Sequence, residues 1–152
     1  NREPVFRGVR SHVGDADGAL DVVKGTFVAA FASIERYDGS RLFRHWINRI
    51  ALNKCRDWGR RRAVRRLFRF ALPLDAATEI VDTAVTGETA IDGARALARV
   101  TKAIASLPVN LKEPLILTAV DGLSQAEAAV VLGISEKAVE VRIYRARKAL
   151  TG

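Results

Sequence analysis

The side chains of this chain with the most definite chemistry are arginines near its C-terminal end. The segment from Asp121 to Leu150 reads DGLSQAEAAVVLGISEKAVEVRIYRARKAL and carries Arg142, Arg145 and Arg147 in its last third. A guanidinium presents a planar fork of N–H donors that fits phosphate oxygens or the N7 and O6 atoms of guanine. These residues therefore indicate binding to a nucleic acid.

Two short helices are expected to position these arginines. Ser124 and Glu127 have the spacing of a capping box at the start of the first helix, and Gly133 can end that helix in the left-handed conformation. Ser135 can cap the second helix. Apolar residues then recur at helical spacing and predict a buried stripe of Val139, Ile143, Ala146 and Leu150.

A short helix, a glycine turn and a basic second helix are typical of a helix-turn-helix, whose second helix enters the DNA major groove. An ordinary helical hairpin with a solvated basic face is the alternative interpretation. We favour DNA binding because the two caps, the small residues and the one-sided arginines occur together. The outward positions of the second helix are predicted to be Lys137, Glu140, Arg142, Tyr144, Arg145, Arg147 and Lys148.

A second basic segment lies in the first half of the chain. Residues 42–70 read LFRHWINRIALNKCRDWGRRRAVRRLFRF and predict a long amphipathic helix with a basic face. For Trp46 in this segment, packing in the core is the favoured interpretation. The arginines at 60–66 could be a solvated charge run, but neighbouring aromatic side chains favour a nucleic-acid face. Those that could stack on bases are Tyr37, Phe43, Trp46 and Trp58.

The distribution of charge supports two separate contacts on one polyanion. The 152-residue chain has a net charge of +8, made up of +9 over residues 1–69, −5 over residues 70–94 and +4 over residues 95–152. Neutralisation of phosphates supplies most of the affinity of a protein for nucleic acid that does not depend on base sequence. An anionic membrane surface or an acidic protein are the alternatives. The chain has no lipidation motif, signal peptide or long apolar run, so we expect no membrane insertion.

The composition argues against an enzyme. The single cysteine, Cys55, cannot form an internal disulfide, which suits a reducing, intracellular compartment. The two histidines, His12 and His45, are isolated and are expected to be structural, so no metal site is predicted. A basic nuclease is rejected because the chain lacks a carboxylate or histidine cluster at acid/base or metal-ligand spacing.

The remaining periodic segments are also helical, and no strand-like alternation occurs, so the fold class is all-α. Asn110 and Glu113 are expected to cap the last of these segments, with Pro114 in its first turn. The acidic stretch at 73–94 is expected to be a linker with at most a weak helical turn. The additional helices are predicted at residues 5–13, 19–36, 94–106 and 111–120.

Three segments, in the correct order, resemble the extracytoplasmic-function sigma factors, group IV of the bacterial sigma-70 family. Residues 19–31, ALDVVKGTFVAAF, resemble the region 2.2 helix, commonly of the form AEDVVQETFLRAW. Residues 46–62, WINRIALNKCRDWGRRR, are similar to the W-L-x-x-I-A-x-N-x-x-x-D-x-x-R-R-x run of regions 2.3 and 2.4. Residues 107–150 resemble region 4, with its G-I-S…V…R-x-x-R-A-R-x-x-L pattern.

The resemblance implies two small helical domains joined by an acidic linker. Residues 1–70 would form the region 2 helical bundle, with a shortened N-terminal part. Residues 71–93 would be the linker, and residues 94–152 the region 4 helix-turn-helix. The family function would be that of an alternative sigma factor, which binds the β′ and β subunits of core RNA polymerase and directs promoter recognition and transcription initiation. The resemblance also implies a cytoplasmic, stress-responsive protein without a cofactor, held by an anti-sigma factor.

The resemblance assigns three sets of site residues. The polymerase-binding set is Asp21, Lys24, Thr26, Phe27 and Ala30. The set for the minus-10 promoter element is Tyr37, Ser40, Arg41, Phe43, Arg44, Asn53, Arg56, Arg60, Arg61 and Arg62. The set for the minus-35 element is Ser135, Lys137, Glu140, Arg142, Tyr144, Arg145 and Arg147.

The chain departs from the family pattern at three positions. Lys24 and Gly25 replace the usual Gln and Glu, which implies a weaker affinity for polymerase or a different partner surface. Glu140 stands where a basic residue is common, and a carboxylate there could accept a hydrogen bond from cytosine N4.

Two other functions compete with this interpretation. A sigma-like mimic that titrates an anti-sigma factor should have lost its basic faces, but this chain keeps them. A stand-alone helix-turn-helix regulator would leave residues 19–69 unexplained.

Overall fold

The computed structural model describes residues 2–39, 42–71 and 88–152, and this part of the chain contains helices and no strand. The all-α prediction is therefore confirmed. The elements are α1 (Arg2–Val13), α2 (Ala16–Ala32), a 3-10 turn η1 (Ile34–Arg36), α3 (Phe43–Ala71), α4 (Glu88–Ala105), α5 (Val109–Leu115), a π-helical turn η2 (Ile116–Val120), α6 (Gln125–Leu132) and α7 (Glu136–Thr151).

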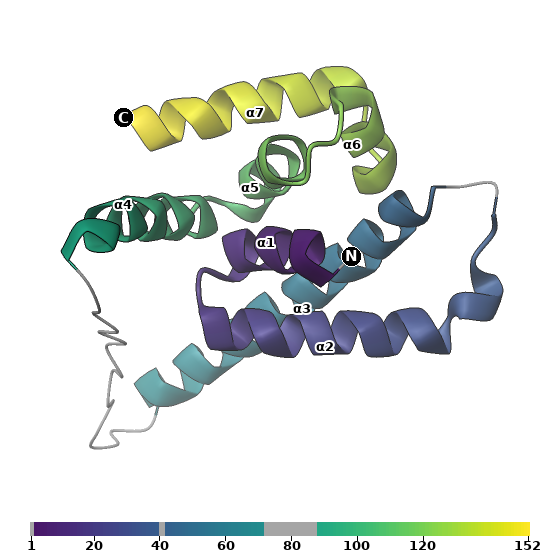
Figure 1. Cartoon of the computed structure of the whole chain (residues 1–152), viewed down its shortest axis with the longest axis horizontal. Helices are drawn as coiled ribbons and strands as arrows, with labels where there is room; N and C mark the ends of the chain where they lie inside the picture. Colours follow the sequence, from purple (N-terminus) through teal and green to yellow (C-terminus); the bar gives the residue numbers. More distant parts are fainter. Residues whose placement is uncertain (1, 40–41, 72–87) are drawn as a thin grey trace.

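Helices α1, α2 and α3 form the first domain around one apolar core (Figure 1). Gly14 ends α1 with a φ of 78°, and the Asp15 carboxylate then accepts hydrogen bonds from the first backbone N–H groups of α2. Gly18 lets α2 approach α3 closely, because a Cβ there would lie 2.9 Å from the Trp58 ring. The buried side chains of this core are Val5, Val9, Val13, Ala19, Val22, Val23, Ala30, Ile47, Ala51 and Cys55.

The second domain consists of α5, η2, α6 and α7 with the end of α4. Its core is separate from that of the first domain, which agrees with two helical units. Ala128 has no exposed surface, so α6 and α7 can pack closely. The buried side chains are Leu107, Leu115, Leu117, Leu123, Ala128, Ala129, Val131, Val139, Ile143 and Ala146.

Three local predictions in the second domain were wrong. Asn110 and Glu113 do not form a capping box, because α5 begins at Val109 after an N-cap at Pro108 that makes no side-chain bond. Pro114 consequently lies inside the helix rather than in its first turn, and the missing N–H there is followed by the wider turn η2. Leu150 is 37% exposed, because α7 extends past the core at its last turn.

The helix α4 begins at Glu88, six residues before the expected start. The apolar spacing seen at 94–104 also continues backwards through Ala90 and Ile91 in the sequence, so the same periodicity supports the longer helix.

The two domains pack against each other. In Figure 1, α4 to α7 form one layer and α1 to α3 the other; α1 contacts α4 and η2, and α3 contacts α6. Gly8 of α1 lies directly against the second domain, where a Cβ would lie 2.5 Å from the Asp121 carboxylate. A side chain at position 8 would therefore require the Asp121 carboxylate to shift.

Candidate nucleic-acid interface

The helix-turn-helix has the local geometry that its sequence predicted. The Ser124 hydroxyl accepts the backbone N–H of Glu127 at 3.1 Å, and the Ser135 hydroxyl accepts that of Ala138 at the same distance. Gly133 ends α6 with a φ of 67°. These bonds lie within a few residues of one another, so local contacts alone fix where α6 ends and where α6 and α7 begin.

Helix α7 buries one face and exposes the other. Val139, Ile143 and Ala146 are buried, as predicted. Among the outward residues, Arg142 is half-buried and Tyr144 is 67% exposed. Lys137 and Glu140 form an exposed ion pair at 3.3 Å, so the Glu140 carboxylate already has a basic neighbour. The exposed cations of this face are Lys137, Arg145, Arg147 and Lys148.

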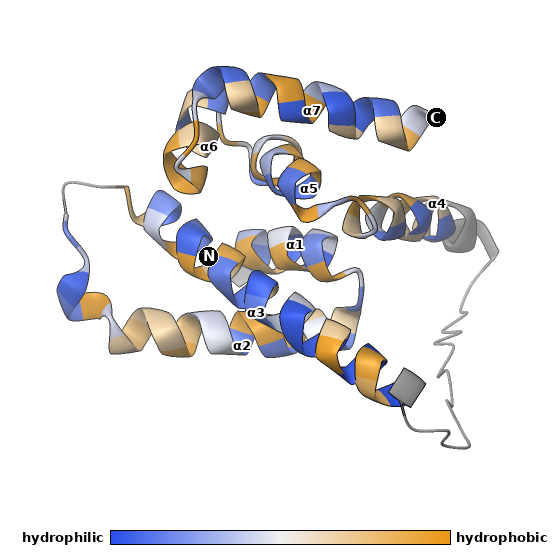
Figure 2. Cartoon of the chain, turned by 180° about the vertical axis from the view of Figure 1, so that it is seen from behind, coloured by the Kyte–Doolittle hydropathy of each residue, from blue (hydrophilic) through white to orange (hydrophobic). Residues whose placement is uncertain are grey.

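The central part of α3 presents a second basic face, and Figure 2 shows hydrophilic and hydrophobic bands alternating along this helix. Arg60 bonds to Asp57 at 2.7 Å, and Arg62 lies 5.2 Å from the centre of the Trp58 ring. Arg61 is exposed. Trp58 itself packs partly against the first core and carries Arg62 on its ring, which leaves less of that ring for stacking on a base.

Three aromatic rings gather just before and at the start of α3. Tyr37 lies 5.0 Å from Trp46 and 5.8 Å from Phe43, measured between ring centres. Trp46 also packs against the first core, in line with its favoured interpretation. Phe43 remains 40% exposed. The other two predicted residues of this segment, Ser40 and Arg41, lie outside the described residues.

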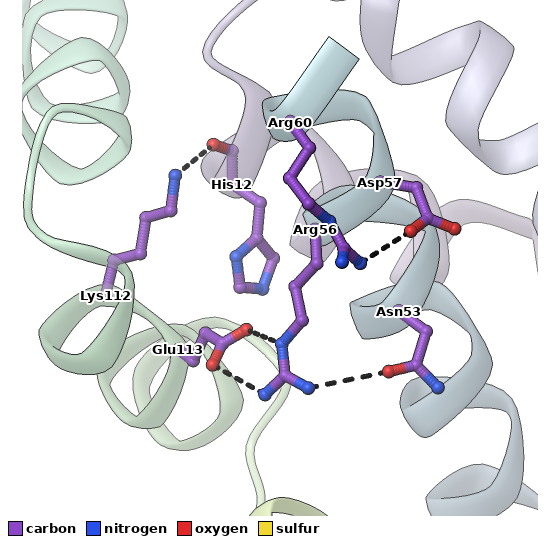
Figure 3. Close-up of polar contacts among 7 residues, drawn as sticks. All are labelled: His12, Asn53, Arg56, Asp57, Arg60, Lys112 and Glu113. Atoms are coloured by element: carbon purple, nitrogen blue, oxygen red, sulfur yellow. Dashed lines mark hydrogen bonds and ion pairs between the residues drawn. The ribbon is translucent and has the colours of Figure 1, made fainter. Parts of the chain in front are cut away.

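Two arginines of the predicted minus-10 set face the second domain (Figure 3 shows the first). The Arg56 guanidinium donates two hydrogen bonds to the Glu113 carboxylate, at 2.7 and 2.8 Å, and a longer one of 3.5 Å to Asn53. Arg44 donates to the backbone carbonyl of Asp121. The sequence alone did not suggest these partners, and the one available signal was a carboxylate at position 113 directly before the apolar residues 114–117.

Burial controls the titration of the polar groups at this contact. It lowers the pKa of His12 to about 3, with Lys112 and Arg56 adding to the shift. It raises the pKa of Asp121 to about 7, against the opposing effect of Arg44 and Arg7. His12 is therefore neutral and Asp121 is partly protonated near neutral pH.

Cys55 in the neighbouring core is also kept neutral, since burial raises its pKa to about 12. It is a packing residue here and not a nucleophile.

The predicted polymerase-binding residues of α2 divide into two groups. Asp21 and Lys24 are exposed, and the half-buried Phe27 lines a shallow apolar groove. Thr26 and Ala30 lie in the first core, where the Thr26 hydroxyl donates to the Val22 carbonyl at 2.7 Å. These two residues present no side chain to a partner. The other groove residues, which sequence reasoning missed, are Val23, Val28 and Phe31.

Two further properties concern the described residues as a whole. No three of their His, Cys, Asp or Glu side chains lie together in a way that could hold a metal ion. None of the described helices is both long and apolar enough to cross a membrane.

Comparison with known proteins matches both domains to one family. Residues 1–66 match "Sigma-70 region 2" and residues 97–150 match "Sigma-70, region 4". The RNA polymerase sigma factor CnrH of Cupriavidus metallidurans is 43% identical over 135 residues, which cover 86% of this chain and 70% of CnrH. The ECF RNA polymerase sigma factor SigC of Mycobacterium tuberculosis is 32% identical over 150 residues, which cover 98% of this chain and 76% of SigC.

Two solved structures are similar to this one. CnrH in complex with the cytosolic domain of CnrY has a TM-score of 0.69 and 37% identity, over 98% of this chain and 79% of CnrH. The sigma factor RpoE in complex with the anti-sigma factor NepR, from Bartonella quintana, has a TM-score of 0.74 over 98% of this chain and 88% of RpoE. At 20% identity, RpoE shows the shared fold alone. Relatives and region matches agree along both domains, and the chain belongs to the extracytoplasmic-function sigma factors of the sigma-70 family, which are non-enzymatic transcription initiation factors.

Proposed function

We propose that the two domains of this sigma factor divide the promoter between them. The first domain, residues 1–70, takes the minus-10 element, and the second, residues 94–152, takes the minus-35 element, with residues 71–93 as the linker. The observation that carries this proposal is the presence of two basic helices, α3 and α7, each mounted on a separate core. A single polyanion can then be held at two places by one chain.

At the minus-35 element, α7 is the reading helix. Its capped N-terminus enters the major groove, where Arg142 and Arg145 contact guanine edges or phosphates. Ser135 and Lys137 lie at the first turn, and Tyr144 and Arg147 further along the helix. The ion pair of Glu140 with Lys137 holds the carboxylate on the same side as these residues, where it accepts from a cytosine amino group.

At the minus-10 element, one base must leave the stack while its neighbours are held as single strand. Unstacking costs a few kcal/mol, which aromatic stacking and phosphate contacts offset. Tyr37 and Phe43 supply aromatic surface, and Ser40 and Arg41 belong to the same set by sequence. The phosphate-binding residues of α3 and its start are Arg44, Asn53, Arg56, Arg60, Arg61 and Arg62.

Core RNA polymerase docks on the exposed face of α2, through its β′ subunit. Asp21 and Lys24 give this face its charges, and Phe27 lines the groove beside them. Phe31 is 76% exposed and extends the same apolar surface. Apolar area of this kind is rare on a protein that functions alone and is typical of an interaction site.

An anti-sigma factor is the natural inhibitor of this protein in the cytoplasm. CnrH was solved with the cytosolic domain of CnrY, and RpoE with the anti-sigma factor NepR. The CnrH similarity supports the same mode of control here, with stress as the releasing signal. The exposed Arg145 and Arg147 argue against a mimic that no longer binds promoters.

The test is run-off transcription with core polymerase and promoter DNA from the native genome. We expect a defined transcript only when this chain is present, and a weaker one with Arg142→Ala. A chain that gives no transcript above core polymerase alone, on any native promoter, would refute the proposal.

A further inference from the structure

The last turns of α3 lie outside both cores. Every residue from 59 to 69 is exposed, and a Cβ added at Gly59 would have open space around it. Figure 1 shows this end of the helix extending beyond α1 and α2. Residues 63–69 follow the last arginine of the predicted minus-10 set, and we call them the α3 tip. Neither core includes a residue of the tip, so packing within the two domains does not explain its side chains.

The α3 tip separates apolar from basic side chains. Val64, Leu67 and Phe68 recur at helical spacing and share one face, where they are 51%, 69% and 64% exposed. Four arginines each lie two residues from one of these apolar positions, and two residues turn a helix by about 200°. The arginines that this spacing brings to the opposite face are Arg62, Arg65, Arg66 and Arg69.

Most charges of this face have no partner in the described part of the chain. None of the ion pairs among the described residues includes Arg65, Arg66 or Arg69. Arg62 lies over the Trp58 ring. Exposed apolar side chains gathered in one place are typical of an interaction site, and here they lie beside unpaired positive charges.

The two faces together decide which partner fits. A nucleic acid would bind the arginines but would leave Leu67 and Phe68 in water. A second copy of the chain could cover these apolar side chains, but it would bring two sets of arginines close together, and like charges repel. A protein groove around Leu67 and Phe68 would leave the arginines of the opposite face unpaired. An anionic lipid surface accepts both faces, because acyl chains take up apolar side chains and headgroup phosphates attract arginines.

The dimensions of a helix allow this contact. A helix with its side chains is about 10–12 Å across. An interfacial helix buries its apolar face about 5–10 Å into the boundary between headgroups and acyl chains. The opposite face then lies at the level of the headgroup phosphates, which long arginine side chains can reach. Such a helix lies on the membrane without crossing it, in agreement with the lack of a membrane-spanning helix among the described residues.

We propose that the α3 tip is a docking site for an anionic lipid surface, with Leu67 and Phe68 inserted between the headgroups and the arginines bound to lipid phosphates. The contact would hold the free protein at an anionic membrane surface. This site goes beyond the proposed function, since no residue of the tip belongs to the surfaces proposed to contact DNA or polymerase.

The test is co-sedimentation of the full chain with vesicles made of equal parts of phosphatidylethanolamine and phosphatidylglycerol. We expect the chain to bind these vesicles and not to bind vesicles of phosphatidylcholine, which carry no net charge. The variant Leu67→Gln with Phe68→Gln should lower the partition coefficient at least about tenfold, because it removes the apolar side chains that insert. The variant Arg65→Gln with Arg69→Gln should lower it roughly twentyfold, since each arginine near an anionic surface contributes about fivefold.

Helix α4 offers a matched control for each variant. Leu97 and Val100 are 68% and 53% exposed, so Leu97→Gln with Val100→Gln removes a similar apolar surface elsewhere. Arg95 and Arg99 are exposed, so Arg95→Gln with Arg99→Gln removes the same net charge. Both controls should change the partition coefficient less than about threefold, because charges away from the contact are screened.

A second measurement reports insertion directly. The variant Phe68→Trp places an indole at the apolar face, and brominated acyl chains quench an indole that lies among them. We expect its fluorescence to be quenched more than that of the wild-type chain, whose Trp46 and Trp58 pack against the first core.

Each other outcome would overturn the proposal. Failure of the wild-type chain to bind the anionic vesicles would do so, as would equal losses in the tip and control variants. An unchanged partition coefficient for Leu67→Gln with Phe68→Gln, or no added quenching in Phe68→Trp, would reduce the contact to charge attraction alone. A dimer in analytical ultracentrifugation that the same double variant dissolves would identify a second copy as the partner. Loss of DNA affinity in that variant, with vesicle binding unchanged, would assign the tip to nucleic acid.

Discussion

His12 by itself should make this protein less stable as the pH falls, whereas Asp121 should oppose that effect. Burial and two neighbouring cations lower the pKa of this side chain to about 3, whereas its ordinary value is 6.5. Below pH 6.5 the unfolded chain binds a proton that the native chain excludes. The neutral His12 therefore makes its full contribution to stability above pH 6.5, and this contribution is lost as the pH falls toward 3. Each pH unit in this window lowers the free energy of unfolding by about 1.4 kcal/mol, or by roughly 2 kcal/mol between pH 6.5 and pH 5.

Asp121 acts in the opposite direction over the same window. Its pKa is raised from 3.8 to about 7 by burial, so the native carboxyl binds a proton that the unfolded chain has released. Its contribution is complete below pH 3.8 and is lost as the pH rises through 7. Between pH 5 and pH 6.5 Asp121 therefore offsets the effect of His12 on the free energy of unfolding by up to about 1.4 kcal/mol per pH unit. This is an upper figure because the Asp121 side chain keeps some contact with solvent.

The assay is urea unfolding at about pH 6.5 and pH 5, followed by circular dichroism and tryptophan fluorescence. We expect the free energy of unfolding of the wild-type chain to differ by less than about 1 kcal/mol between the two pH values, since the two groups oppose each other. The variant Asp121→Asn leaves His12 unopposed, and its free energy of unfolding should fall by roughly 2 kcal/mol on acidification. The variant His12→Gln leaves Asp121 unopposed, and its free energy of unfolding should rise by a comparable amount. The same change with pH in all three proteins would refute the reasoning.

Three further predictions concern the surfaces. Arg142→Ala should weaken binding to minus-35 duplex DNA by about 1–3 kcal/mol in fluorescence anisotropy and leave co-purification with polymerase unchanged; equal DNA affinity would count against the role of α7. Asp21→Arg should abolish co-purification with core polymerase, and undiminished recovery would rule out the α2 docking face. Gly8→Ala should loosen the domain contact and enlarge the radius of gyration measured by small-angle X-ray scattering, because its Cβ would lie 2.5 Å from the Asp121 carboxylate. The control Gly59→Ala has open space around it and should raise helix stability by up to about 1 kcal/mol, and an equal expansion in both variants would contradict this view.

Sequence reasoning succeeded where the interactions were local. The helix-turn-helix could be predicted because Ser124, Gly133 and Ser135 act on backbone groups within three or four residues of themselves. The buried stripe of α7 followed for the same reason, since helical spacing alone brings Val139 and Ile143 to one side.

Apolar spacing did not show which face of α2 is buried, because this helix is apolar over much of its surface (Figure 2). The family resemblance selected five residues along this helix. Only the packing of α1 and α3 against it separated the buried Thr26 and Ala30 from the exposed Asp21 and Lys24.

What the sequence by itself determined was an all-α chain with two basic helical modules, because helix caps and apolar spacing act over a few residues. Only the tertiary structure decided which charged side chains of one module pair with groups of the other. Asn110 and Glu113 have the spacing of a capping box, but Arg56, 57 positions away in the chain, offers the carboxylate two charge-assisted bonds instead. A local pattern carries no information about such a distant partner, and the fold that brings the partner close determines which bond forms.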